Sequence, residues 1–272
     1  MQYLLAYRFV FQSRNWLKNL LFGSLSFFVP LGGPMVFVGY LFEVIEWLHR
    51  RREEEKLPWV EPTGIAAAPQ GSIQTEPGGP AGDFQYAAPD HYPDFNVNRI
   101  QDYLMRGVWP FLVQMLVHLP VTFLFVGLYV LMLALIGIGT ASGGPPWAAV
   151  AIFLAGLAVS LLVAVATVVL LVPLYLRAGL SRDFGSAFSM AFLKDFLKRT
   201  GKELVLSQLF LQATGPLVGL VGMMACGVGM YPAMVLWTMA KHHIDYQLYE
   251  LYLQRGGEPI RPRDERPAVE KR

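Results

Sequence analysis

The chain has 272 residues, a mean hydropathy of +0.40 and charged residues at only 15% of its positions, below the roughly 25% of an average soluble domain. The formal net charge of +2 is too small to indicate nucleic-acid binding, and the basic residues instead lie beside apolar runs, a membrane-orientation pattern. A single cysteine, Cys226, excludes an intramolecular disulfide and a cysteine-rich metal site.

The first apolar block extends from residue 16 to residue 47, which is too long for one crossing of a hydrocarbon core of about 30 Å. Pro30 and Pro34, with two glycines between them, would break a helix there. We therefore expect a hairpin of two membrane segments, at residues 3–29 and 35–52. Residues 53–98 are rich in Pro, Gly, Ala and Gln without periodicity, which predicts a disordered cytoplasmic insert.

The next two apolar blocks are each long enough to span a membrane, and they predict helices at residues 104–139 and 147–176. In residues 182–200, phenylalanines recur at every fourth position among charged residues, at Phe184, Phe188, Phe192 and Phe196. This pattern predicts an amphipathic helix that lies in the membrane interface. The alternative is a helix that packs on another part of this protein.

The last apolar block, residues 204–240, again exceeds one crossing, and its prolines and glycines favour a turn near residues 216–222. We expect membrane segments at 203–217 and 221–250, followed by a charged, flexible cytoplasmic tail at 251–272. The predicted fold class is an all-α integral membrane protein. It is a six-segment helical bundle, with two Gly/Pro-broken hairpins flanking two long transmembrane helices, plus one interfacial amphipathic helix.

The distribution of basic residues predicts the orientation of this bundle. All 22 Lys and Arg residues fall before residue 19, at 50–106, at 177–202 or after residue 240, and six segments place these four regions on one side. Because cytoplasmic loops are enriched in basic residues, we expect both termini in the cytoplasm and the bundle in the cell membrane. Cys226 would then lie near the outer face. A re-entrant hairpin also returns to its starting side, so either short hairpin could dip without crossing.

Ionisable groups inside lipid are costly and are therefore functional candidates. Glu43 and Glu46 share one face near the inner end of the second segment. They form either a proton or cation site, or a structural pair in which Glu46 binds Arg50 one turn later and both carboxylates reach the headgroups. His242, His243 and Asp245 follow the last segment, but a metal site would need further ligands.

Two pairs of polar residues repeat the i, i+4 spacing inside predicted membrane segments. Gln114 and His118 share a face of the third segment, and Gln208 and Gln212 share a face of the fifth. Such side chains either join helices by hydrogen bonds or line a polar path through the bundle. A polar path predicts that all four converge on one wet cavity.

Several short motifs resemble an uncharacterised prokaryotic membrane family, domain of unknown function 4013. They are Asn15-Trp16-Leu17-Lys18-Asn19-Leu20-Leu21 with Gly39-Tyr40, Tyr92-Pro93-Asp94-Phe95 with Met105-Arg106-Gly107, and Lys241-His242-His243-Ile244-Asp245-Tyr246-Gln247-Leu248-Tyr249. The resemblance implies a polytopic membrane protein of bacterial or archaeal type, and it transfers no activity, cofactor or catalytic residue.

The leading functional hypothesis is a membrane scaffold or accessory protein without enzymatic activity, cofactor or metal. Its partners are the lipid bilayer and either other membrane proteins or a second copy of the chain, but not nucleic acid. The alternative is a small-solute or ion transporter or channel that uses the polar residues of the third and fifth segments.

Overall fold

The computed structural model describes residues 1–55, 92–225 and 227–262, and every regular element in these ranges is a helix. The predicted all-α class is therefore confirmed for the described part of the chain. The elements are α1 (Tyr3–Val10), α2 (Trp16–Ser26), α3 (Gly32–Glu55), the short 3-10 helix η1 (Val97–Arg99), α4 (Ile100–Ala141), α5 (Pro146–Ser181), α6 (Phe184–Ala187), α7 (Met190–Met224) and α8 (Met230–Gln254).

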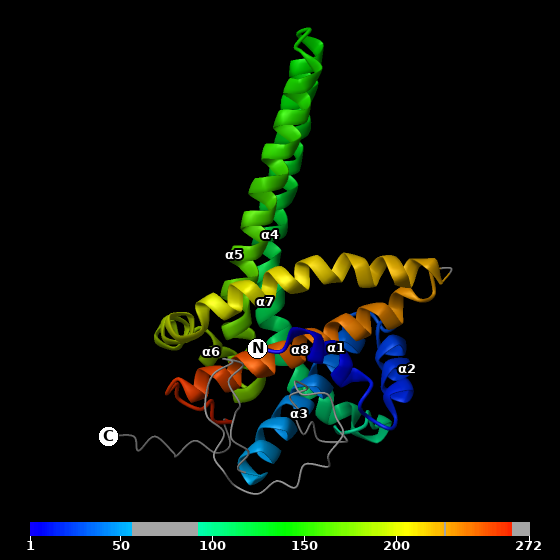
Figure 1. Cartoon of the computed structure of the whole chain (residues 1–272), viewed down its shortest axis with the longest axis vertical. Coiled ribbons are helices and arrows are strands. Elements are labelled where there is room, and N and C mark those ends of the chain that lie inside the picture. The colour runs from blue at the N-terminus through cyan, green and yellow to red at the C-terminus, as the bar shows by residue number, and fades with distance from the viewer. Residues whose placement is uncertain (56–91, 226, 263–272) are drawn as a thin grey trace, which may run out of the picture.

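The helices α4 and α5 form a long hairpin that projects far beyond the rest of the molecule (Figure 1). No side chain between Gln114 and Leu170 is buried, although this stretch is strongly apolar. We call residues 114–170 the apolar hairpin. The other helices, together with the ends of α4 and α5 nearest to them, form a compact unit that we call the base. Within the described ranges, three helices, α4, α5 and α7, are long and apolar enough to cross a membrane.

The core of the base is centred on α3, which packs closely against the start of α4. Two glycines make this contact. A Cβ on Gly39 would lie 1.8 Å from the carbonyl oxygen of Tyr103, and a Cβ on Gly107 would lie 1.8 Å from that of Met35. Only glycine fits between two backbones at this separation. The aromatic ring of Tyr40 is completely buried beside this contact.

The N-terminal segment expected at 3–29 consists of two helices, α1 and α2, separated by residues 11–15. Polar side chains at this break replace helical hydrogen bonds. The Ser13 hydroxyl accepts the backbone N–H of Asn15 at 3.2 Å, and the Asn15 amide binds the carboxylate of Asp94. Such local side-chain bonds compete with helix continuation.

The interfacial helix expected at 182–200 is also divided. Arg182 has a left-handed φ of 53° and ends α5, Asp183 caps α6, and Ser189 caps α7. The rings of Phe192 and Phe196 are buried, with centroids 5.5 and 5.1 Å from that of Tyr252 on α8. Here the phenylalanine face packs on the protein itself, as the alternative interpretation proposed.

The turn expected near residues 216–222 lies further along the chain. Helix α7 passes through Pro216 and ends at Met224, and α8 begins at Met230. Proline removes one helical N–H donor, and this loss does not end α7. The turn occurs beside Gly227, whose φ of 78° is a conformation that glycine adopts without strain. Residue Cys226, expected near the outer face, lies outside the described residues.

The expected disordered insert at 53–98 falls largely on residues 56–91, outside the described residues. Residues 92–98 pack on the base. Of the expected flexible tail, residues 255–262 are described and are held by hydrogen bonds to α8. The Tyr249 hydroxyl accepts the N–H of Ile260 at 2.9 Å, and the Tyr252 hydroxyl accepts that of Glu258 at 3.2 Å.

Candidate functional site

The carboxylates of Glu43 and Glu46 lie in a cluster of charges where α3 meets the start of α4 and the end of α5. The Glu43 carboxylate accepts from Arg99 at 2.5 Å, and the Glu46 carboxylate lies 2.9 Å from Arg106 and 3.2 Å from Arg182. Arg106 also lies 3.8 Å from Glu43. We call these five residues the arginine–glutamate cluster.

The charges of this cluster distinguish between the two roles expected for Glu43 and Glu46, a proton or cation site and a structural pair. Two carboxylates face three guanidinium groups, so the cluster has a net charge of +1 and does not suit a cation. The Glu46 carboxylate pairs with Arg106 of α4 and with Arg182 at the end of α5, and not with Arg50 of α3 as the structural interpretation expected. The cluster therefore joins α3 to η1, to the start of α4 and to the end of α5.

The four polar residues expected to line a path are not brought together. On α4, Gln114 is exposed, and the half-buried His118 ring hydrogen-bonds through Nδ1 to the Gln114 carbonyl of its own helix at 2.9 Å. On α7, Gln208 is buried and Gln212 is exposed. Helix α4 packs on α3 and α5, whereas α7 packs on α8 and α5.

A second site joins segments far apart in sequence and was not anticipated. The Asn19 side chain accepts the backbone N–H of Phe95 at 2.9 Å and donates to Asp94 at 3.4 Å. The hydroxyl of Tyr92 donates to the Val10 carbonyl at 2.8 Å. These bonds hold the segment before α4 against the junction of α1 and α2. The motifs quoted for the family resemblance contain Asn19, Tyr92, Asp94 and Phe95, but nothing in their spacing indicates that they touch.

Two adjacent histidines on α8 are buried and neutral. The His242 ring donates through Nδ1 to the Thr238 carbonyl at 2.8 Å, so Nε2 accepts from the Tyr175 hydroxyl, also at 2.8 Å. His243 accepts from Gln247 at 3.1 Å and stacks on Phe9. Burial lowers the pKa of each histidine to about 3, because the charged form loses its hydration.

The same helix carries two buried acidic residues with basic partners. Asp245 is completely buried, and its carboxylate accepts from Lys241 at 2.6 Å. Burial raises the pKa of Asp245, and Lys241 only partly opposes this shift. The Glu250 carboxylate binds Arg52 and lies 2.6 Å from the ring of His49. Burial lowers the pKa of His49, but Glu250 and Glu53 together raise it by more, so the pKa is raised overall.

The described residues were expected to hold no metal site. Among them, no group of three or more His, Cys, Asp or Glu residues is placed to hold a metal ion.

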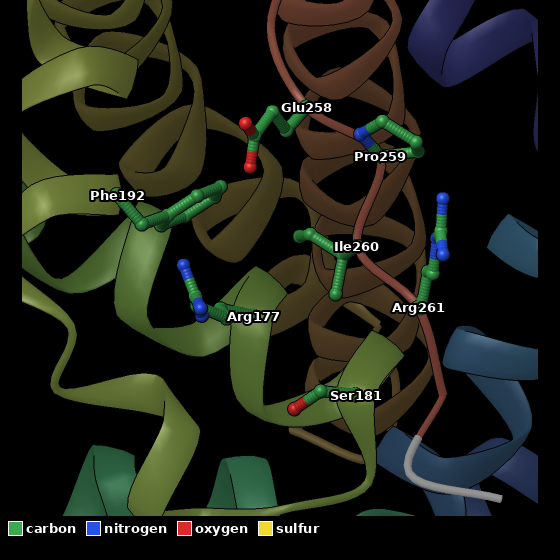
Figure 2. Close-up of a pocket in the computed structure, with 7 residues that line it drawn as sticks. All are labelled: Arg177, Ser181, Phe192, Glu258, Pro259, Ile260 and Arg261. Carbon is green, nitrogen blue, oxygen red and sulfur yellow. The ribbon is translucent and has the colours of Figure 1, made fainter. Parts of the chain in front are cut away.

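A pocket of about 580 Å³ lies where the end of α5 and the start of α7 meet residues 258–261 (Figure 2). The Arg177 guanidinium stands over the Phe192 ring, 4.6 Å from its centroid. The Ser181 hydroxyl hydrogen-bonds to Ser186 at 2.6 Å. The volume is within the range of small-molecule sites. The lining residues are Arg177, Ser181, Phe192, Glu258, Pro259, Ile260 and Arg261.

Comparison with known proteins bears out the resemblance noted in the sequence. Residues 85–227 match the family described as "Protein of unknown function (DUF4013)". This stretch covers more than half of the chain and contains α4 and α5 entire. No curated protein and no solved structure matches the chain. The chain belongs to the DUF4013 family of proteins of unknown function.

Proposed function

We propose that this protein is an integral membrane protein of the cell membrane, in which the apolar hairpin crosses the bilayer and the base and both termini remain in the cytoplasm. We propose further that it acts as a non-enzymatic scaffold or accessory protein, with the base as the part that contacts other membrane proteins or a second copy of the chain.

The observation that carries this proposal is that the strongly apolar hairpin has no buried side chain. Its two arms pack on each other and bury no side chain, and an exposed apolar surface of this extent marks a membrane or protein contact. From Gln114 to Ala141, α4 rises about 40 Å, enough to cross a hydrocarbon core of about 30 Å. Between Gly107 and Leu176 the sequence has no Asp, Glu, Lys or Arg.

The charge distribution supports a cytoplasmic base. With one hairpin crossing, all Lys and Arg residues stay on the same side, which is the cytoplasmic side in most membrane proteins. The proposal therefore keeps an even number of crossings, but only two of the six predicted segments, those at 104–139 and 147–176, cross the bilayer. The buried face of α3, which includes Phe37, Leu41 and Ile45, is covered by protein rather than by lipid.

The separation of the polar residues supports a scaffold over a transporter. A transport path requires polar groups that converge in a water-filled cavity, whereas Gln114 and His118 lie on one hairpin and Gln208 and Gln212 on another helix. His118 and Thr122 each form a hydrogen bond within α4 itself, as structural polar residues of membrane helices do.

The topology is tested with single cysteines in a Cys226→Ser background. Ser142 lies at the tip of the apolar hairpin and Arg14 lies in the base, and both are exposed. An impermeant maleimide added to intact cells should label Ser142→Cys and should label Arg14→Cys only after permeabilisation. Equal labelling of both cysteines in intact cells would refute the proposed crossing.

The scaffold role is tested by two measurements on the full chain. Purification in mild detergent after cross-linking should retain a defined protein partner or a second copy of the chain. In proteoliposomes, the flux of small cations and neutral solutes should equal the protein-free background, both for the wild type and for His118→Ala. Flux above background that His118→Ala abolishes would favour the transporter instead.

A further inference from the structure

Helix α7 carries a second exposed apolar surface, on the side away from α8. Toward the base it buries Leu204, Gln208 and Leu211, and Trp237 of α8 donates a hydrogen bond to the Leu211 carbonyl at 3.2 Å. The opposite side is what we call the outer face of α7. Its exposed apolar side chains are Val205, Leu206, Leu209, Leu217, Leu220, Val221 and Met224.

The outer face continues toward the start of α7 as a row of exposed lysines four residues apart. These are Lys194, Lys198 and Lys202. The acidic residues of this part of α7 are engaged in ion pairs, Asp195 with Arg199 at 2.8 Å and Glu203 with Arg255 at 2.6 Å. The outer face is therefore cationic at one end and mainly apolar along the rest, and the acidic side chains beside its lysines are paired with arginines.

The direction of α7 decides how this face can meet a bilayer. In Figure 1, α7 runs across the apolar hairpin rather than along it, and α8 lies on the base side of α7. Two helices that cross in this way cannot both stand perpendicular to the same bilayer. The apolar hairpin buries no side chain, whereas one side of α7 is buried against the base. The hairpin therefore takes the perpendicular direction, and α7 then lies along the membrane surface.

The position of Gln212 agrees with a shallow location. Its side chain is exposed on the outer face, near the middle of the apolar part of α7. In a helix that spans the bilayer, this amide would meet hydrocarbon without a hydrogen-bond partner, which is costly. At the depth of the headgroups, water and lipid oxygens can satisfy it.

We propose that the outer face of α7 binds the surface of the cytoplasmic leaflet, with its lysines among anionic lipid headgroups and its apolar side chains in the acyl boundary below them. This is the binding mode of an in-plane amphipathic helix with a cationic flank. An interfacial helix is thus still proposed, but its lipid-binding surface is the outer face of α7 and not the phenylalanine face of residues 182–200. The proposal rests on the crossing of the apolar hairpin.

The first test locates the end of α7 relative to that crossing. In the Cys226→Ser background, Val228 is 74% exposed and serves as a single cysteine beside the turn between α7 and α8. An impermeant maleimide outside intact cells should label Ser142→Cys but not Val228→Cys. Labelling of both would show that α7 spans the bilayer and would overturn this inference alone. Absence of labelling at Ser142→Cys would instead refute the crossing itself.

The second test measures depth and lipid preference. An environment-sensitive fluorophore on Leu206→Cys, in proteoliposomes of phosphatidylglycerol, should be quenched more by nitroxides near the lipid headgroup than by nitroxides deep in the acyl chains. In phosphatidylcholine, the fraction of the fluorophore that is embedded in the bilayer should be smaller. A water-like emission in both lipids, or stronger quenching at depth, would overturn the proposal.

The lysines are tested with a charge-matched control. In Lys198→Gln/Lys202→Gln, the ratio of embedded to water-exposed probe in phosphatidylglycerol should fall by about fivefold for each lysine removed. The control Arg50→Gln/Arg261→Gln removes two exposed charges from other parts of the base, and its ratio should stay at the wild-type value. An equal fall in both variants would mean that net charge, and not the outer face, attracts the lipid.

Discussion

At the scale of single residues, the contact between α3 and α4 depends on the absence of two Cβ atoms. A methyl group at Gly107 would overlap the backbone of Met35, and a backbone cannot move aside as a flexible side chain can. We expect Gly107→Ala to cost at least the 1–3 kcal/mol typical of an overpacked core. Thermal unfolding of the purified protein in detergent measures this loss.

The apolar hairpin supplies a matched control on the same helix. A Cβ on Gly127 of α4 would meet nothing within 4 Å, so Gly127→Ala should leave the unfolding temperature at or slightly above the wild-type value. A Gly107→Ala protein that is as stable as Gly127→Ala would contradict the close approach of the two helices.

The two buried histidines predict a loss of stability in acid. In the folded base their pKa is about 3, whereas an unfolded histidine has a pKa of about 6.5. Below pH 6.5 the unfolded state therefore binds more protons, and the free energy of unfolding falls as the pH falls toward 3. Between a pH well above 6.5 and pH 5, each histidine should contribute a loss of roughly 2 kcal/mol.

The contribution of one histidine is isolated by replacing it with a side chain that does not titrate. Asparagine at position 243 keeps an acceptor for Gln247, so His243→Asn should show a smaller decrease in unfolding free energy between pH 7.5 and pH 5 than the wild type. An unchanged slope in His243→Asn would exclude the buried neutral histidine as a source of the acid sensitivity.

At the scale of the elements, the arginine–glutamate cluster fixes the ends of α4 and α5 to α3. Removing the charge of Glu46 leaves Arg106 and Arg182 facing each other with one carboxylate fewer. Because these groups are partly exposed, solvent screens part of the loss, and we expect Glu46→Gln to cost about 1–2 kcal/mol. Unfolding in detergent with denaturant measures this cost.

Two further variants separate the cluster from a general effect of charge. Glu54→Gln removes an exposed carboxylate from the same helix and should change stability by less than about 0.5 kcal/mol. The double variant Glu46→Gln/Arg182→Gln should recover part of the loss, since it also removes the uncompensated arginine. A double variant that simply adds the two single losses would mean that the two residues do not interact.

Features that depend on neighbouring residues could be predicted from the sequence, whereas contacts between distant segments could not. Apolar runs and their length are local properties, so the sequence indicates two long helices at 104–139 and 147–176, where α4 and α5 lie. The position of the last turn depends on whether tertiary packing tolerates a proline, and α7 continues through Pro216. The partners of Glu46 and Asn19 come from elements more than fifty residues away, and one sequence gives no indication of those pairs.

At the scale of the whole molecule, the base is stabilised by a buried protein core, whereas the apolar hairpin is proposed to be stabilised by contact with lipid. The base has its own buried core, formed mainly by residues of α1, α3, α7, α8, the start of α4 and the end of α5, whereas the apolar hairpin buries no side chain. Replacing residues 118–166 with a short Gly-Ser loop removes most of the hairpin and keeps the contacts of α3 with the start of α4. We expect the shortened chain to remain helical by circular dichroism and monodisperse on gel filtration.

Such a shortened chain should also change its membrane association in a defined way. Carbonate washing should leave the full chain in the membrane pellet, because a crossing hairpin is not released by loss of electrostatic attachment. It should release the shortened chain, which keeps only the outer face of α7 as a lipid contact. At neutral pH the shortened chain should still sediment with phosphatidylglycerol vesicles, and this binding should weaken with salt, since exposed charges are screened within about 10 Å at 0.1 M. A shortened chain that resists carbonate would place a second crossing in the base.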